Sequence, residues 1–344
     1  MRAVVITGHG GNEVVRIEER PIPVRKPGEA LIAVKGAGLN RVDLYMRNSG
    51  AGITHAIPQI LGLDAAGVVE EVDPGEKRLK VGQKVVLHPA TGCGRCEFCQ
   101  RGEHILCVES KYFGEHRDGT LAEFMCVPVE NLFPMPEGLD FVEAAALSVS
   151  YITAWRMVFG KAQLKSWETA LIFGIGGSVS LAALQLAKMI GARAIVTSRD
   201  PEKLRRATDL GADATINGAT EDVAKRTLAL TDGRGVDVVI ENVGEAVWPA
   251  AMKSLVRGGR IVTCGATSGD HPSADLRRLF IRQLQVFGST HGSMAEFAAM
   301  VEACNRGLFR PLIESRYGLA DIHAALDRLE AGQQFGKIGI DLTL

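Results

Sequence analysis

Hydrophobic and polar positions follow two different patterns along the chain, and the first occupies residues 1 to about 130. There, short runs rich in Val and Ile are separated by Gly and Pro, which is typical of strands joined by turns. We expect strands at AVVIT (3–7), EVVRIEE (13–19), ALIAVKG (30–36), GVVEEV (67–72) and QKVVLHP (83–89). Few helical periods lie among them. This part therefore predicts an irregular, barrel-like β domain.

The second pattern, from about 141 to 290, alternates strands with helices after a linker at PMPEGLDF (134–141). We expect helices at 180–191, 201–211, 221–231 and 246–259, and strands at 169–175, 192–198, 213–217, 236–243, 260–266 and 283–290. Six strands separated by helices predict an α/β, doubly wound parallel sheet.

The remaining segment, 291–344, has two amphipathic helix candidates and a closing strand, KIGIDLTL (337–344). It is too short for a core of its own, so we expect it to fold back onto the first domain. The predicted domains are therefore 1–140 together with 291–344, and 141–290.

Composition adds exclusions to this picture. The 344 residues are 46% hydrophobic and 23% charged, with a net charge of -1, as in ordinary soluble globular proteins. That balance favours a small-molecule substrate over a nucleic acid or a membrane. The N-terminus MRAVVITGHG does not resemble a signal peptide, and Gln185, Lys188 and Arg193 interrupt the longest apolar run. We expect a cytoplasmic protein.

Four of the seven cysteines lie close together, in GCGRCEFCQRGEHILC (92–107). Cys93, Cys96, Cys99 and Cys107 have the spacing C-x2-C-x2-C-x7-C, in which two-residue gaps let thiolates converge on one ion. Four sulfurs suit a closed, tetrahedral, structural Zn²⁺ site. An iron–sulfur cluster also uses four thiolates but favours other spacings. We expect one structural zinc per chain.

A glycine-rich loop, IFGIGGSVSLAAL (172–184), follows a predicted strand and opens a predicted helix. Gly174, Gly176 and Gly177 allow a tight turn and the approach of a pyrophosphate to the helix N-terminus, so the loop predicts dinucleotide binding. The third glycine of this motif, which serves close packing of helix on strand, is replaced: its place falls at Val179, or at Ser178 or Ser180.

The cofactor's ribose is expected at the end of the next strand, in AIVTSRDPEKL (194–204). Enzymes that use NAD usually have an acidic residue there for the 2′-OH. Ser198 takes that position and Arg199 follows it, with Lys203 one turn further, and these residues favour the 2′-phosphate of NADP(H). The alternative is that Asp200 contacts the ribose and Arg199 is merely solvated.

These features together resemble the medium-chain dehydrogenase/reductase superfamily, which includes zinc alcohol dehydrogenases and quinone oxidoreductases. The resemblance covers nearly the whole chain, including the cysteine lobe, GIGGSVS, VDVVIENVG (236–244), GGRIVTCGATSG (258–269) and FGKIGIDL (335–342). It implies a GroES-like catalytic domain beside a Rossmann domain, and dimers or tetramers formed through the sheet edge at QLQVFGST (283–290). It also implies cofactor contacts at Thr153, Val243, Gly265 and Lys337.

The resemblance also locates the ligands of a second, catalytic zinc. The positions that hold a Cys, a His and a Cys or Asp in zinc alcohol dehydrogenases are occupied here by Asn40, Leu63 and, less surely, Val149, and Asp64 replaces a Glu. Leu63 and Val149 have no lone pair to offer a metal, so we expect no catalytic zinc.

Without that metal, alcohol oxidation is disfavoured, and the resemblance implies reduction of an activated C=C bond or a quinone. Asn40 and Tyr45 are the implied catalytic donors, although Tyr45 could instead be a packed aromatic, and Asp43 is expected to be structural. Two alternatives stay open: an alcohol or aldehyde dehydrogenase with a non-standard site, and a non-catalytic NADPH-binding protein.

Overall fold

The computed structural model describes all residues from Met1 to Leu344 and divides into two compact units. Unit 1 is Met1–Ser150 with Ser293–Leu344, and unit 2 is Tyr151–Gly292. The first junction therefore follows Ser150 instead of residue 140. The reason is that helix α3 (Phe141–Ala145) packs on strands β3 and β5 of unit 1, so closely that a side chain at Gly36 would collide with the backbone of Phe141.

Unit 1 is built on a seven-stranded sheet with the order β10-β6-β5-β3-β18-β17, in which β9 also pairs with β3. A second sheet has the order β2-β1-β4. The strands are β1 Arg2–Ile6, β2 Val15–Glu19, β3 Glu29–Gly38, β4 Gln59–Ile60, β5 Asp64–Glu71, β6 Lys84–Leu87, β9 Phe124–Pro128, β10 Leu132–Pro134, β17 Ile313–Gly318 and β18 Lys337–Asp341.

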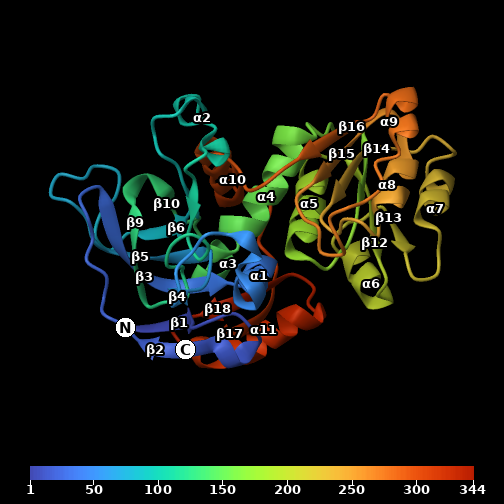
Figure 1. Cartoon of the computed structure of the whole chain (residues 1–344). Helices are drawn as coiled ribbons and strands as arrows, with labels where there is room; N and C mark the ends of the chain where they lie inside the picture. The colour runs from blue at the N-terminus through green and yellow to red at the C-terminus, as the bar shows by residue number, and fades with distance from the viewer. The chain divides into compact units, whose positions relative to one another are not determined.

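The C-terminal segment completes this sheet, because β18 pairs antiparallel with β3 (Figure 1). The segment contains two helices, as its sequence predicts: α10 (Met294–Asn305) and α11 (Ile322–Ala331). The buried face of α11, including Ile322, Leu326 and Leu329, joins the core of the N-terminal strands. Strand β17 lies between these helices and was not predicted.

Short elements connect the strands of unit 1. Helix α1 (Arg41–Ser49) follows β3, and a cysteine-containing lobe lies between β6 and β9. The lobe contains β7 Ala90–Thr91, α2 Glu97–Gln100, η3 His104–Leu106 and β8 Lys111–Tyr112, and the remaining turns are η1 Asn12–Val14, η2 Gly50–Gly52, η4 Val129–Asn131 and η7 Leu319–Asp321.

Unit 2 is a six-stranded, entirely parallel sheet with the order β13-β12-β11-β14-β15-β16. The strands are β11 Thr169–Ile172, β12 Arg193–Ser198, β13 Ala214–Asn217, β14 Val236–Glu241, β15 Leu255–Thr263 and β16 Gln285–Gly288. The expected combination of an irregular β domain and a doubly wound six-stranded sheet is confirmed.

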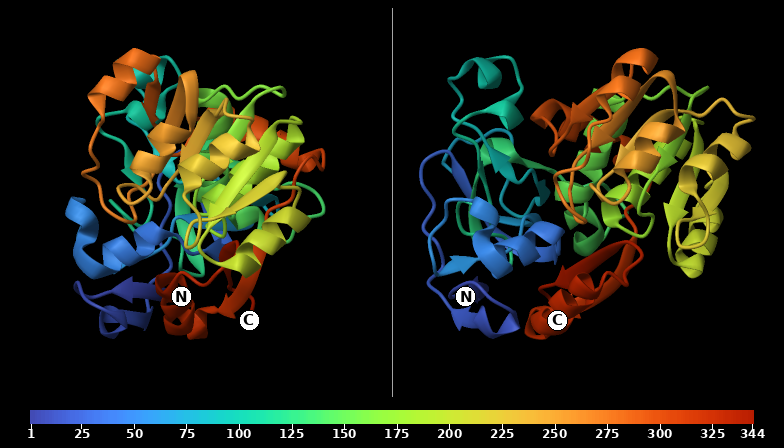
Figure 2. Two further views of the ribbon diagram at one scale, coloured as in Figure 1. Left: turned by 90° about the vertical axis from the view of Figure 1, so that its right-hand side faces the viewer. Right: turned by 45° about the vertical axis from the view of Figure 1, so that its right-hand side comes forward.

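Helices lie on both sides of these strands (Figure 2). They are η5 Leu147–Tyr151 at the junction, α4 Ile152–Trp155, η6 Arg156–Lys161, α5 Ser178–Met189, α6 Pro201–Asp209, α7 Val223–Leu230, α8 Trp248–Ser254 and α9 Leu276–Arg282. The predicted helix 246–259 is wrong in its second half, since Leu255 already pairs with Val236 in the sheet. Helix α9 was not predicted. None of the helices has the length and apolar character needed to cross a membrane.

Candidate active site

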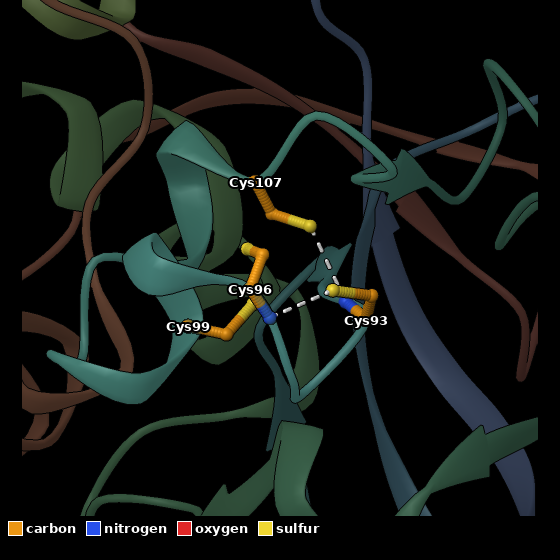
Figure 3. Close-up of side chains that lie close together, drawn as sticks. All are labelled: Cys93, Cys96, Cys99 and Cys107. Atoms are coloured by element: carbon orange, nitrogen blue, oxygen red, sulfur yellow. Dashed lines mark hydrogen bonds between the residues drawn. The ribbon is translucent and has the colours of Figure 1, made fainter.

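The four cysteines of the lobe converge on one point, as their spacing predicts (Figure 3). The sulfur atoms of Cys93, Cys96, Cys99 and Cys107 all lie within 4.8 Å of one another, and all four thiols are free of disulfides. Gly94 turns the chain between the first two with φ +73. Gly92 leaves room for the cluster, because a side chain there would lie 2.9 Å from the Cys99 Sγ.

Backbone donors already point at these sulfurs. The Cys96 N–H donates to Cys93 Sγ, and the Cys93 N–H donates to Cys107 Sγ, each over 3.4 Å (Figure 3). Hydrogen bonds from the backbone of Arg95 and Cys96 lower the pKa of Cys93 to about 6, which favours its thiolate. A ring of four sulfurs with N–H donors around it fits one tetrahedral metal ion.

The glycine loop of unit 2 has the backbone geometry that its sequence predicts. Gly174 and Gly176 have φ +67 and +120, which side chains rarely adopt, and Gly177 precedes the first residue of α5. Ser180 fulfils the packing role of the missing third glycine. Its buried hydroxyl donates to the Phe173 carbonyl over 2.8 Å and holds α5 against β11. Ser178 and Val179, the other two positions considered, lie half-buried in the first turn of α5.

Most of the predicted cofactor residues of unit 2 lie at one edge of its sheet. Each of four predicted residues lies at or shortly after the carboxyl end of a strand: Gly174 after β11, Ser198 at the end of β12, Val243 after β14 and Gly265 after β15. Because these strands are parallel, their carboxyl ends lie at the same edge of the sheet. The strand order reverses beside β11, where doubly wound sheets bind nucleotides. Thr153 is buried on α4, which packs against α5.

The residues at the end of β12 bear on which side chain contacts the cofactor's ribose, Asp200 or Ser198 with Arg199. Asp200 is the N-cap of α6, and its Oδ1 accepts the N–H groups of Glu202 and Lys203 at 2.9 and 3.4 Å. This carboxylate is therefore engaged in capping. Arg199 is exposed and forms no ion pair, while Ser198 is half-buried at the end of the strand.

Unit 1 contains a buried polar cluster at the ends of three adjacent strands. Asp64 begins β5, Gly38 ends β3 directly opposite, and Lys337 begins β18 on the other side of β3. Lys337 Nζ forms an ion pair with Asp64, donates to Asn40 Oδ1 over 2.6 Å, and donates to Ser150 Oγ over 3.3 Å. The side chains of Lys337 and Asp64 are 1% and 0% exposed.

A second carboxylate, Asp43, lies beside this cluster and fixes the start of α1. Its Oδ2 accepts the Asn40 N–H over 2.7 Å, and its Oδ1 accepts the Gly62 N–H over 3.1 Å. Burial raises the pKa of Asp43 to about 7, although the two N–H groups that donate to its carboxylate lower the pKa. Burial also raises the pKa of Asp64, although Lys337 opposes it.

The two predicted catalytic donors have different surroundings. Tyr45 lies on the exposed face of α1, is 39% exposed, and its hydroxyl forms no hydrogen bond. Asn40 is 8% exposed, and its Nδ2, which has no close hydrogen-bond partner, faces the Asp64 carboxylate, whose pKa the Asn40 side chain lowers. Leu63 is completely buried, whereas Val149 is half-buried and its N–H lies beside the Asp64 carboxylate.

Sequence reasoning missed the partnership between Lys337 and Asp64. The resemblance implies a cofactor contact for Lys337, and the structure adds that its ammonium group contacts Asp64, Asn40 and Ser150. The signal available was the apolar context of the lysine, since it stands in FGKIGIDL beside residues that a central strand would bury. A lysine buried in that way needs an anionic partner.

Comparisons with known proteins agree with this construction. Residues 26–137 match the family model of the alcohol dehydrogenase GroES-like domain, and residues 178–306 match that of the zinc-binding dehydrogenases. The NAD-dependent alcohol dehydrogenase of Saccharolobus solfataricus is 31% identical, over 98% of this chain and 99% of the relative.

Solved structures show the same similarity. One of an NAD-dependent alcohol dehydrogenase has a TM-score of 0.96 and 37% identity, over 99% of this chain and 100% of that one. Another, a cobalt- and zinc-bound thermostable alcohol dehydrogenase from Pyrobaculum aerophilum, has a TM-score of 0.89 and 32% identity, over 99% of each chain.

Proposed function

Since the chain belongs to the medium-chain dehydrogenase/reductase superfamily and is an oxidoreductase of that family, we propose that it reduces an activated C=C bond or a quinone with NADPH. The observation that carries this proposal is the Asn40 amide. Its Nδ2 is a buried donor beside the Asp64 carboxylate, without a close hydrogen-bond partner, at a position where zinc alcohol dehydrogenases are expected to hold a metal ligand. Such a donor suits an enolate oxygen.

The roles of the residues follow from their surroundings. NADPH, when bound, supplies the hydride. The Asn40 Nδ2 donates to the carbonyl or quinone oxygen, on which negative charge develops, and this interaction is stronger in the transition state than in the ground state. The free, exposed Tyr45 hydroxyl is the proposed proton donor. Leu63 keeps the surroundings of the cluster apolar, which strengthens each electrostatic contact.

The preference for NADPH over NADH is part of the same proposal. Arg199 is unpaired and Asp200 is engaged as a helix cap, so the end of β12 offers a positive charge to a 2′-phosphate. We also propose that the four cysteines hold a zinc ion that stabilises the lobe. A site closed by four thiolates has no open position for a substrate, so this ion has no place in the reaction.

A panel of acceptors tests the reaction. Enones, quinones and aldehydes are offered with NADPH, alcohols with NADP⁺ and NAD⁺, and the nicotinamide absorbance is followed. We expect reduction of enones or quinones, and Tyr45→Phe should lower turnover about 10²-fold or more while cofactor affinity stays unchanged. Unaltered rates in both Tyr45→Phe and Asn40→Ala would remove these residues from the mechanism.

A second candidate is alcohol oxidation with a non-standard site. The names of the relatives favour it, since those reported above are alcohol dehydrogenases and two are described as NAD-dependent. Rapid oxidation of primary alcohols with NAD⁺, abolished by a chelator, would establish this candidate and exclude the reductase.

A further inference from the structure

A pocket of about 510 Å³ lies at the end of the unit 2 sheet where the strands begin. Its lining comes from the residue before β11, the start of β14 and the first half of β15, all within unit 2. The predicted cofactor residues lie at the carboxyl ends of these strands. Since β14 has six residues and each adds about 3.3 Å, roughly 20 Å of strand separates the two ends. The pocket is therefore distinct from the cofactor edge.

The lining of this pocket is strongly basic. It contains four arginines and two carboxylates, namely Arg234, Arg257, Arg260 and Arg282 with Glu168 and Asp237. Both carboxylates are engaged, because Glu168 accepts from Arg260 Nη2 over 2.7 Å and Asp237 accepts from Arg234 Nη2 over 2.6 Å. Arg257 and Arg282 hydrogen-bond only to backbone carbonyls. Two positive charges in the pocket thus have no carboxylate partner.

These two arginines are held near each other by the backbone. Arg257 Nη1 donates to the Ile281 carbonyl over 3.2 Å, and Arg282 Nη2 donates to the Leu255 carbonyl over 2.9 Å. Each guanidinium group therefore contacts the segment that carries the other. The Arg282 Nε is buried without a hydrogen-bond partner. Burial and the guanidinium groups of Arg278 and Arg257 lower the pKa of Arg282, as expected where positive charge lacks a counterion.

A bulge in β15 contributes Arg257 to the lining. Leu255 pairs with Val236 and Arg260 pairs with Val238, so the four residues 256–259 of β15 lie opposite the single residue Asp237 of β14. Arg257 is in this unpaired segment and its side chain is exposed. Bulges of this kind are frequent beside functional sites, where they change the direction of a side chain.

The charge and size of the pocket indicate the class of ligand. A phosphate monoester carries nearly two negative charges at neutral pH and offers three acceptor oxygens, which suits two guanidinium groups. The volume of about 510 Å³ lies within the range of small-molecule sites and leaves room beside a phosphate group. The carboxylates of Glu168 and Asp237, which line that remaining space, accept hydrogen bonds from hydroxyl groups.

We propose that this pocket binds a phosphate monoester, with its phosphate group between Arg257 and Arg282 and its hydroxylated remainder beside Glu168 and Asp237. The site goes beyond the proposed function. It takes a ligand other than the cofactor or the acceptor, at the opposite end of the strands from the cofactor edge.

Isothermal titration calorimetry of the full chain, in chloride buffer at constant ionic strength, tests the proposal with three probes. Inorganic phosphate should bind at one site per chain with a dissociation constant on the order of 1 mM. Glucose 6-phosphate should bind at least as tightly, and glucose should give no saturable heat. Absence of saturable binding by both phosphates overturns the proposal, and weaker binding of glucose 6-phosphate than of inorganic phosphate overturns the assignment to a monoester.

Variants locate the binding and separate it from folding. Arg257→Gln changes an exposed side chain and should weaken both phosphates about 10-fold or more, with an unchanged melting temperature. Arg282→Gln should weaken them similarly, although it also loses the contact with the Leu255 carbonyl. Arg205→Gln is the control, because Arg205 is already paired with Glu202 and Asp209. Wild-type affinity in Arg257→Gln overturns the proposal.

The cofactor's own phosphate sites must be excluded as the place of binding. The titrations are repeated with NADPH or NADH, whichever binds more tightly, at a saturating concentration. We expect one phosphate site per chain to remain with unchanged affinity, since the pocket lies at the other end of the strands. Loss of phosphate binding in the presence of the cofactor overturns the proposal.

Discussion

Among single residues, Asp43 shows how burial changes an ordinary side chain. It is completely buried at the start of α1, where it accepts the N–H groups of Asn40 and Gly62. The negative charges of Asp43 and Asp64 repel each other, and Lys337 only partly offsets this effect. Its pKa of about 7 in the folded chain is well above the value of 3.8 for a solvated carboxyl group.

This difference predicts a pH dependence of stability. Between about pH 4 and pH 7 the folded chain keeps a proton on Asp43 that the unfolded chain has released, so stability falls as the pH rises through this range. Urea unfolding at a series of pH values should show a decrease of up to about 1.4 kcal/mol per pH unit from this group. Asp43→Asn should flatten that decrease, and identical slopes in both proteins would contradict the shift.

Sequence analysis found the site residues that lie close together along the chain. The cysteine ring is encoded within fifteen positions, and the glycine loop lies between one strand and the helix that follows it. Lys337 and Asp64 are a different case, because they are brought together by two strands that each pair with β3. No spacing in the sequence records such a contact, so it could not be predicted.

Among the elements, the turn from β12 into α6 has a composition that suits a phosphate. Asp200 caps the helix, Pro201 occupies its first turn, and Arg199 is left exposed before the cap. The capping role therefore accounts for the acidic residue that the alternative interpretation assigns to the ribose. Arg199 beside it is exposed and forms no ion pair.

Arg199→Ala should weaken NADPH binding about 10- to 100-fold and leave NADH binding unchanged. Dissociation constants for both cofactors, measured by titration, check this expectation. Arg205→Ala is the matched control on the same helix, because Arg205 is already paired with Glu202 and Asp209. Equal affinity of the wild type for the two cofactors would show that the ribose is read elsewhere.

The cysteine lobe depends on its metal for order, since it has only short strands and turns of its own. Closing a four-thiolate site contributes on the order of 10 kcal/mol in small zinc domains. Cys99→Ser should therefore release the zinc and increase hydrogen exchange across residues 93–107, while cofactor affinity persists. Cys126→Ser, outside the cluster, should retain one zinc per chain. Wild-type protein with no zinc, or with two zinc ions, would contradict the assignment.

For the whole molecule, the exposed edge of the unit 2 sheet has the properties of an interface. Strand β16 pairs only with β15, and the apolar side chains of Val286, Phe280 and Leu276 are 44%, 69% and 67% exposed at or beside it. Edge strands of this kind pair with other chains unless they are protected. We propose that two copies of the chain associate through β16, as the resemblance implies.

Val286→Lys should convert this assembly to a monomer, because the introduced charge would be buried between two edge strands. Sedimentation velocity of the wild type and the variant measures the change. Val81→Lys, at another exposed valine, should leave the mass unaltered. If the wild type sediments as a monomer, the proposed association through β16 is wrong.

The architecture was predictable where the hydrophobic pattern repeats, and less so where neighbouring elements impose a structure. The central strands β11, β12 and β14 are buried almost throughout, as expected for a sheet that is covered on both faces. Leu255 and the residues after it were expected to be helical, but pairing with β14 makes them a strand. Local preference gave way there to tertiary contacts.

The glycine at position 38 limits which substitutions the neighbouring buried residues tolerate. Asn40, Asp64 and Lys337 fit one another only over a strand without a side chain, and loss of either charged member alone leaves a buried charge uncompensated at about 3–5 kcal/mol. A single substitution at either charged position is therefore destabilising, whereas a paired substitution that removes both charges avoids the uncompensated charge.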